Sequence, residues 1–390
     1  MKFASRVQSL GGARASAWDI HHQAGERLAA GEDVIVLSIG EAEFDTAETI
    51  VDAAVKSLRA GRTRYAAAEG VMAFREAVAR QHASMTGQAV TARNVVIMPG
   101  AQCGLFSASM VCCDPGTEVI LADPAYVTYE AVIAASGAHS VYVPLRFDDG
   151  FRFHPADIEA AVTPRTRAIL LNTPHNPTGA VISRADMAAI GEIARAHDLW
   201  IIVDEVYAEL VYEGEHISPA SFPELQSRTL SVGSLSKSHS MTGWRLGWVV
   251  GPREVAKHLG ELSIAMLYGQ PPFLQDAGAY ALNHAMHEVA QTRATFRKRR
   301  DVLCDALKNV SNLGCQRPAG GMFLMVDIRA TGLDGDRFAQ RLLDEQGVSV
   351  LSGDAFGDST RGYVRIGLTQ TEEKLAEAAR RIGAFTKSLL

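Results

Sequence analysis

Residues 229–247 read Thr229-Leu-Ser-Val-Gly-Ser234-Leu-Ser-Lys237-Ser-His-Ser-Met-Thr242-Gly-Trp-Arg245-Leu-Gly247, and this stretch decides the fold. Residues 229–232 predict a buried strand. A lysine flanked by serines directly after a buried strand is not typical of a solvated surface loop. An amine that attacks a carbonyl must be neutral, so its usual pKa of ~10.4 must fall through burial or a nearby cation. Arg245 can supply that cation, and its planar fork can hold phosphate oxygens. A chance pairing of Lys237 and Arg245 is the alternative, and their spacing favours a functional pair.

A second motif lies at residues 200–207, which read Trp200-Ile-Ile-Val-Asp204-Glu-Val-Tyr207. Four apolar residues place Asp204 at the carboxyl end of a buried strand, where open α/β sheets bind ligands. A carboxylate at that point can keep a pyridine nitrogen protonated, and Tyr207 can reach an oxygen on the same ring. A helix N-cap at Asp204 is the alternative, but a cap explains neither Tyr207 nor the lysine strand.

Two further segments support this interpretation. Residues 172–179, Asn172-Thr-Pro-His-Asn176-Pro-Thr-Gly179, form a defined loop in which Asn176 offers an amide and an X-Pro bond can be cis. Residues 99–102, Pro99-Gly100-Ala101-Gln102, stand between a predicted strand and a helix, where free backbone amides bind phosphate. For residues 172–179 a plain turn is the less favoured alternative, whereas turns like that of residues 99–102 occur in every α/β protein and only support the interpretation.

Short apolar strands alternate with amphipathic helices over most of the chain, which predicts a largely parallel sheet covered on both faces. Seven strands of one large α/β domain are expected at residues 95–98, 118–122, 140–143, 168–171, 200–204, 229–232 and 244–250. Helices are expected between them at residues 101–111, 126–135 and 183–196.

The C-terminal part predicts a smaller α/β domain. A helix-favouring stretch runs from Arg253 to Lys308, and its segment 293–300 is expected to be a solvated face. Strands are expected at residues 322–327, 348–351 and 363–366, followed by a helix from Glu372, and a strand at 34–39 can complete this domain. We therefore predict a large domain of residues 46–285 and a second unit made of residues 1–45 and 286–390.

Composition narrows the class of protein. The net charge of −6 gives no support for nucleic-acid binding. The five cysteines, an odd number without metal-ligand spacing, predict reduced thiols and no metal site. Residues 1–18 lack the apolar core of a signal peptide, and no apolar run reaches the ~20 residues of a membrane span. A cytoplasmic protein is expected.

Taken together, the motifs resemble those of the class I and II aminotransferases, over essentially the whole chain and in the same order. The resemblance rests on Tyr65, Gly100-Ala101-Gln102, Tyr126, Asn176, Asp204, Tyr207, Ser234, Lys237, Arg245 and Arg365. It implies a fold-type I transferase that uses pyridoxal 5′-phosphate (PLP) and moves an α-amino group from an L-amino acid to a 2-oxo acid by a ping-pong mechanism. It also implies a homodimer.

The resemblance implies a role for each matching residue. Lys237 would carry PLP as a Schiff base and then shuttle the substrate proton. The other roles are Asp204 at the pyridine nitrogen, Tyr207 and Asn176 at the 3-oxygen, Tyr126 stacked on the ring, Ser234, Arg245, Gly100, Ala101 and Gln102 at the phosphate, Tyr65 reaching the partner's phosphate site, and Arg365, Asn176 and the backbone of Ile39–Gly40 at the substrate carboxylate. One segment departs from the family: Gly40-Glu-Ala-Glu-Phe-Asp-Thr-Ala47 lacks two prolines that are usual there, which leaves its path open.

A closer likeness concerns the substrate. Residues 17–21, 235–244, 266–269 and 321–329 resemble arginine–pyruvate aminotransferases. A guanidinium group favours a carboxylate and an aromatic face, which Trp18 and Asp19 can supply if the N-terminal segment covers the site. Glu41 and Glu43 are further candidates. The alternative, in which Asp19 caps a helix and Trp18 packs between domains, carries equal weight.

Other functions remain open from the sequence. The same cofactor site serves carbon–sulfur β-lyases, and the donor of an aminotransferase can also be aspartate, an aromatic or another neutral amino acid. A nicotinamide oxidoreductase would need a Gly-x-Gly-x-x-Gly turn after a strand, and none is found. A regulatory module would be expected to lose Lys237 or to add a DNA-binding domain.

Overall fold

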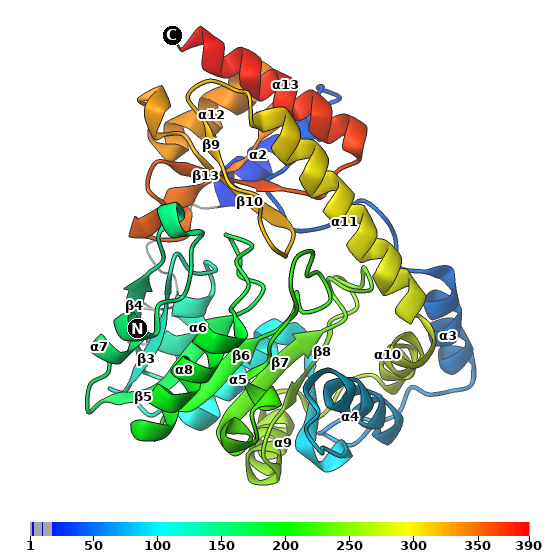
Figure 1. Ribbon diagram of the computed structural model, residues 1–390. Coiled ribbons are helices and arrows are strands. Elements are labelled where there is room, and N and C mark those ends of the chain that lie inside the picture. The colour runs from blue at the N-terminus through cyan, green and yellow to red at the C-terminus, as the bar shows by residue number, and fades with distance from the viewer. Residues whose placement is uncertain (1, 4–9, 11–17, 390) are drawn as a thin grey trace.

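The structure is a computed structural model that describes residues 2–3, 10 and 18–389. In Figure 1 a broad sheet with its helices forms the lower part of the molecule, and a smaller group of strands and helices sits above it. The helix α11 (Met286–Leu307) runs obliquely from the upper part down to the lower one. The expectation of no signal peptide concerns residues that lie mostly outside the described part.

The predicted seven-stranded, mostly parallel sheet is confirmed. Its order is β2-β8-β7-β6-β5-β3-β4, and β8 alone runs antiparallel to both of its neighbours. The strands are β2 (Val95–Pro99), β3 (Glu118–Asp123), β4 (His139–Pro144), β5 (Thr166–Asn172), β6 (Trp200–Asp204), β7 (Thr229–Ser234) and β8 (Leu246–Val250). Predicted strand 244–250 begins two residues late, because Arg245 has a φ of 53° and cannot join a strand.

Helices cover both faces of this sheet, so its strands are buried apolar runs. They are α3 (Glu48–Arg59), α4 (Met72–Thr86), α5 (Gly100–Cys112), α6 (Tyr129–Ala135), α7 (Pro155–Ala160), α8 (Arg184–Ala196), α9 (Arg253–Leu267) and α10 (Pro272–His284). The helix expected at 126–135 begins at Tyr129 instead, since Tyr126 belongs to the loop that reaches the functional cavity.

The smaller part contains two short sheets. In one, β1 (Ile35–Val36) pairs in parallel with β11 (Val348–Ser349). The other has the order β12 (Leu351–Ser352), β13 (Tyr363–Gly367), β10 (Phe323–Asp327) and β9 (Gly314–Cys315). The helices α2 (Asp19–Ala29), α12 (Gly335–Gln346) and α13 (Glu372–Ser388) surround them. The division of the chain at residues 45/46 and 285/286 stays a prediction.

Three expectations for this smaller part were wrong in detail. The strand at 34–39 shrinks to Ile35–Val36 and the strand at 348–351 splits between two sheets. The face at 293–300 is not uniformly solvated: Arg299 and Arg300 are 4% and 2% exposed. Both lie on the side of α11 that faces the core, where each arginine meets a carboxylate, Glu43 and Glu213 respectively. Charged residues alone do not reveal such pairing.

Candidate active site

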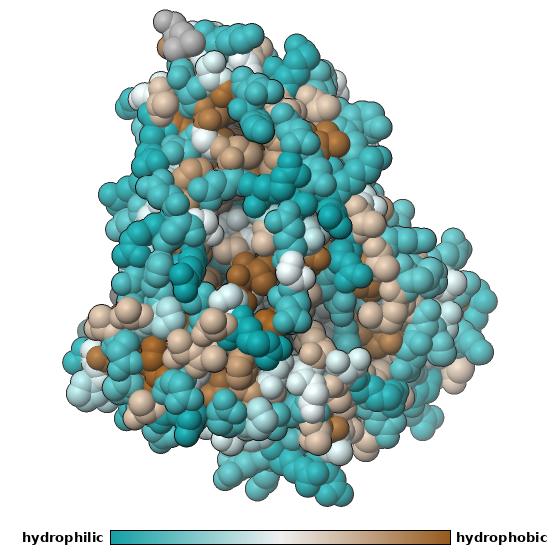
Figure 2. All heavy atoms as spheres, viewed as in Figure 1, coloured by the Kyte–Doolittle hydropathy of each residue, from teal (hydrophilic) through white to brown (hydrophobic). Residues whose placement is uncertain are grey.

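A cavity of about 290 Å³ lies at the carboxyl ends of β6 and β7, the edge at which α/β sheets bind ligands. It brings together residues from distant parts of the sequence. Among those proposed from the sequence, its lining includes Trp18, Gly40, Ala101, Gln102, Tyr126, Asn176, Asp204, Tyr207, Ser234, Lys237, Arg245 and Arg365. The space-filling view shows a hollow, with apolar side chains at its centre, between the upper and lower parts of the molecule (Figure 2).

Asp204 ends β6, as predicted, and is buried. Its Oδ2 accepts a hydrogen bond from the Tyr129 hydroxyl at 2.7 Å, and its Oδ1 accepts one from the backbone N–H of Val206 at 3.2 Å. Burial raises the pKa of this carboxyl group to about 6, while the two hydrogen bonds oppose the rise. Within the described part of the chain Asp204 forms no salt bridge, so its carboxylate can receive a protonated ring nitrogen.

Lys237 follows β7 and its amine lies in the same cavity. Burial, assisted by the cations Arg365 and Arg245, lowers its pKa to about 8, while the Glu41 carboxylate opposes this change. Burial is therefore the leading cause, and Arg245, the cation expected from the sequence, ranks behind Arg365. The Nζ atom donates to the carbonyl oxygen of Gly40 at 2.6 Å. With a pKa of about 8, roughly a tenth of the amine is neutral at pH 7, far more than for an ordinary lysine.

Arg245 and the start of α5 form an anion site. Gly100 has a φ of 77°, and a Cβ there would lie 2.2 Å from the Arg245 Nη2, so only glycine allows the guanidinium to approach. The guanidinium donates to the carbonyl oxygens of Thr242 and Pro99 at 2.7 and 3.3 Å, which fixes its orientation. Together with the Ser234 hydroxyl and the free amides of the helix start, it can hold a phosphate.

The other two residues predicted for this anion site, Ala101 and Gln102, lie in the first turn of α5 and line the cavity. The Gln102 side chain accepts a hydrogen bond from the Thr128 hydroxyl at 2.9 Å. Its oxygen is therefore tied to the loop that carries Tyr126.

Asn176 and Tyr207 stand side by side, since the Asn176 amide is a hydrogen-bond partner of the Tyr207 hydroxyl. Burial raises the pKa of Tyr207, so its phenol keeps its proton and remains a donor. The backbone N–H of Asn176 donates to the Asn172 Oδ1 at 2.7 Å, and the peptide bonds before Pro174 and Pro177 are cis. The Asn176 side chain from this loop and the Tyr207 side chain from the segment after β6 line the same cavity.

Arg365, from β13, is a buried guanidinium, 1% exposed. It donates to the Asn176 Oδ1 at 3.1 Å and to the Ser38 carbonyl oxygen at 2.8 Å, and the Phe323 and Phe356 rings lie against its planar group. Its Nε has no hydrogen-bond partner among the described residues. A buried donor of this kind needs an acceptor, which a substrate carboxylate can provide.

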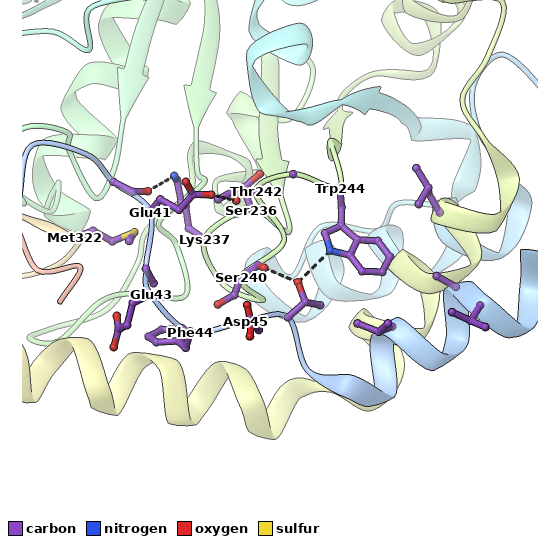
Figure 3. A pocket seen from close by; sticks show the side chains of 18 of the residues that line it. Glu41, Glu43, Phe44, Asp45, Ser236, Lys237, Ser240, Thr242, Trp244 and Met322 are labelled. Carbon is purple, nitrogen blue, oxygen red and sulfur yellow. Dashed lines mark hydrogen bonds between the residues drawn. The ribbon is translucent and has the colours of Figure 1, made fainter. Parts of the chain in front are cut away.

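A second cavity, of about 680 Å³, adjoins the first at Lys237 (Figure 3). The segment 40–46, whose path the sequence left open, lines it. The segment is held by the Thr242 hydroxyl, which donates to the Glu41 carboxylate, and by a salt bridge from Arg299 to Glu43. Glu43 is thereby neutralised, whereas Glu41 lines both cavities.

The structure separates the remaining candidates. Trp18 lines the first cavity, but Asp19 is exposed in the first turn of α2 and lines neither cavity. Tyr65 is 86% exposed and its ring meets that of Tyr268 at a centroid distance of 5.1 Å, away from the cavity of its own chain.

The sequence missed Tyr129, the donor to Asp204. The sequence did contain an indication of this residue, because Tyr129 follows Tyr126 by three residues and begins a helix. Nothing in the spacing tells which strand end such a tyrosine will meet, so only the structure reveals the contact.

The comparisons with known proteins agree with this geometry. The sequence model of the family described as aminotransferase class I and II matches residues 32–382. Arginine–pyruvate transaminase AruH of Pseudomonas aeruginosa is 50% identical over 390 residues, covering 100% of this chain and 99% of the relative. Aspartate aminotransferase of Geobacillus stearothermophilus is 34% identical, with both chains fully covered.

Solved structures resemble the fold closely. Aspartate aminotransferase of Thermus thermophilus with maleate superposes with a TM-score of 0.93 at 33% identity, covering all of both chains. Aromatic aminotransferase of Pyrococcus horikoshii gives 0.89 at 33% identity, covering 94% of this chain and 100% of the other. The predicted fold type I is therefore confirmed, and the chain belongs to the class I and II aminotransferases.

Proposed function

We propose that this aminotransferase uses PLP to move the α-amino group of L-arginine to pyruvate. One observation carries the proposal: the Lys237 amine, with its pKa lowered to about 8, shares a cavity with the buried Asp204 carboxylate and with Arg365, whose Nε lacks a partner among the described residues. Such a cavity suits a ligand that has a carbonyl carbon, a protonated ring nitrogen and a carboxylate.

The residues of the first cavity fit PLP. The anion site of Gly100, Ser234 and Arg245 matches its phosphate, and the buried Asp204 carboxylate, which forms no salt bridge with a described residue, matches a protonated pyridine nitrogen. Tyr207 and Asn176 would hold the 3-oxygen, and the ring of Tyr126 would lie against that of the cofactor. When bound, PLP supplies an electron sink for the pair of electrons left at the substrate α-carbon.

The protein's part in the reaction is to bind, orient and move a proton. Arg365 would hold the substrate α-carboxylate, with Asn176 fixing one of the guanidinium nitrogens. This places the α-carbon near Lys237, whose neutral amine can take the α-proton and would deliver it to the C4′ carbon of the cofactor before the oxo acid leaves.

The proposal that arginine is the amino donor rests on the charged side chains of the two cavities that have no role in binding PLP or the substrate α-carboxylate. The basic side chains of the first cavity, Lys237, Arg245 and Arg365, all have roles already, so the side-chain carboxylate of aspartate finds no free cation in the described lining. Glu41 remains as a carboxylate at the junction of the two cavities, and Trp18 offers an aromatic face. The transaminase of P. aeruginosa, whose name gives arginine and pyruvate, supports the same donor and acceptor.

A homodimer is part of the proposal. Large apolar side chains on one stretch of the surface, Tyr65, Met72, Ile264 and Tyr268, are exposed by 52–86%. Their burial in a partner would remove apolar area from water, and Tyr65 could then reach the partner's anion site. In the described part of the chain, no helix has the length and apolar character needed to cross a bilayer. A cytoplasmic location stays a prediction.

The test is the fate of the amino nitrogen. Purified protein with PLP receives L-arginine labelled with ¹⁵N at the α-amino group, together with pyruvate, and the alanine formed is examined by mass spectrometry. Labelled alanine and 5-guanidino-2-oxopentanoate are expected in equal amounts. Transfer from aspartate or phenylalanine but not from arginine would refute the substrate assignment. Ammonia and pyruvate released from a cysteine conjugate would favour the β-lyase.

A further inference from the structure

We propose that Tyr129 is a positioning residue whose hydroxyl holds the Asp204 carboxylate ionised and aimed at the ring nitrogen of PLP. The inference rests on the proposed function, because it gives Asp204 its partner. It adds a residue that the motifs of the sequence did not single out.

The direction of the contact is fixed by chemistry. The Tyr129 hydroxyl has one proton to give and lies 2.7 Å from Asp204 Oδ2, and an ionised carboxylate only accepts. The other oxygen, Oδ1, accepts the backbone N–H of Val206. Each oxygen therefore has one donor from the protein, which fixes the carboxylate plane while leaving lone pairs for a ligand.

Packing fixes the phenol. Tyr129 is 2% exposed and belongs to the apolar cluster between the sheet and α5. Its ring meets the edge of Tyr126 at a centroid distance of 5.6 Å and an angle of 78°. The segment 126–129, which leads into α6, is tied to α5 through Thr128 and Gln102. This one segment thus provides both the ring that would lie against PLP and the donor to the Asp204 carboxylate.

Electrostatics show why the donor is needed. The charged and titratable groups that face Asp204 are Glu205 beside it, Lys237 from the loop after β7, and the tyrosines Tyr126, Tyr129 and Tyr207. Burial and the Glu205 charge favour the protonated acid, whereas the Tyr129 hydrogen bond leads the groups that favour the ion. Without that hydroxyl the pKa of Asp204 would rise above its value of about 6, toward the pH at which the enzyme works.

The test is Tyr129→Phe, which keeps the buried ring and removes only the hydroxyl. Tyr212→Phe is the matched control, since Tyr212 is also buried, 7% exposed, and its hydroxyl donates to the Gly321 carbonyl and not to Asp204. PLP affinity of the cofactor-free chain is measured by absorption titration from acid to alkaline pH, and kcat and KM are then measured over the same range.

We expect Tyr129→Phe to bind PLP about tenfold more weakly at neutral pH, as loss of one hydrogen bond to a charged group implies. The pH below which PLP affinity and kcat decline, the acid limb of each pH profile, should rise by about one unit. The value of kcat should fall, and KM for the amino donor should change little. Tyr212→Phe should leave the pH profiles unchanged. A folded Tyr129→Phe with the affinity and acid limb of the wild type overturns the inference.

If Tyr129→Phe does not fold, the proposal is tested instead with 3-fluorotyrosine in place of Tyr129. It retains the shape and strengthens the donor, so the acid limb should move to lower pH, and an unmoved limb contradicts the proposal. A wild-type chain that binds no PLP overturns the proposed function itself, which is a different result from a Tyr129 variant that behaves like the wild type.

Discussion

At the scale of single residues, Arg365 joins the substrate to the protein. Replacing it with Ala removes the planar donor and leaves a substrate carboxylate buried without a partner. We expect amino-acid binding to weaken by ~2–5 kcal/mol for every donor alike, because all share the α-carboxylate. Dissociation constants from spectral titrations would show this, with Arg361→Ala as the control, an exposed guanidinium four residues away. Unchanged affinity in Arg365→Ala would mean that the carboxylate binds elsewhere.

The buried Asp204 carboxyl group affects both PLP binding and the free energy of unfolding. Its pKa in the folded chain, about 6, exceeds its ordinary value of 3.8, so the folded state holds more protons between these pH values. Stability of the cofactor-free chain therefore falls as pH rises through this window and stays lower above it. Asp204→Asn removes the buried charge, so at pH 7 it should stabilise the cofactor-free chain by roughly 1–3 kcal/mol while weakening PLP binding.

Thermal unfolding at pH 4 and pH 7 tests this prediction. The gap between Asp204→Asn and the wild type should widen with pH, whereas the exposed Asp358→Asn should show no such trend. An Asn variant that is less stable than the wild type at pH 7 would contradict the burial argument.

The residue types in the sequence predict most of the residues of the site but not the contacts between them. Asp204 could be placed from the sequence because four apolar residues before it predict a buried strand that ends there. The partners of Tyr129 and Arg299 could not, since they lie 75 and 256 residues away along the chain. A tyrosine at a helix start and an arginine in a charged helix look like surface residues until the fold brings a carboxylate to them.

At the scale of elements, the start of α5 depends on one glycine. Gly100→Ala should weaken binding of PLP by about tenfold or more, because its Cβ would displace the Arg245 guanidinium. Gly116→Ala is a matched control: its φ of 84° imposes similar backbone strain, but a Cβ there meets nothing within 4 Å. Titration with PLP measures both. Equal losses of PLP affinity in the two variants would mean that backbone strain alone causes the effect.

Element boundaries were predicted best where burial is uniform. The strand at 200–204 has the same ends in sequence and structure, because every residue of β6 after Trp200 is buried. The strand at 34–39 is shorter than predicted. After Leu37, whose N–H still donates to the Ser349 carbonyl of β11, the Ser38 carbonyl oxygen accepts a hydrogen bond from Arg365, a functional contact that a hydrophobic pattern does not encode.

At the scale of the whole molecule, the dimer can be tested by mixing variants. Lys237→Ala lacks the amine and Tyr65→Ala lacks the ring proposed to reach the partner. In a mixed dimer, one site has Lys237 from one protomer and Tyr65 from the other. Mixing the two variants should therefore restore activity to about a quarter of the wild-type value at equal amounts, as random pairing of protomers predicts.

Activity after dissociation and reassociation provides the measurement, and Lys237→Ala mixed with Lys257→Ala, an exposed lysine, gives the baseline for exchange. Restored activity would also show that the sites lie at the subunit interface. No gain from the first mixture would mean that Tyr65 acts within its own chain or not at all.

The claim on which everything else depends is that Lys237 holds PLP in this cavity. The most direct measurement is the visible absorption spectrum of purified protein with PLP, followed during addition of L-arginine and then pyruvate. We predict a band from lysine-bound PLP that arginine abolishes, pyruvate restores and Lys237→Ala never forms. A wild-type protein without that band, or a Lys237→Ala variant with a band that cycles in the same way, would show that Lys237 does not hold PLP.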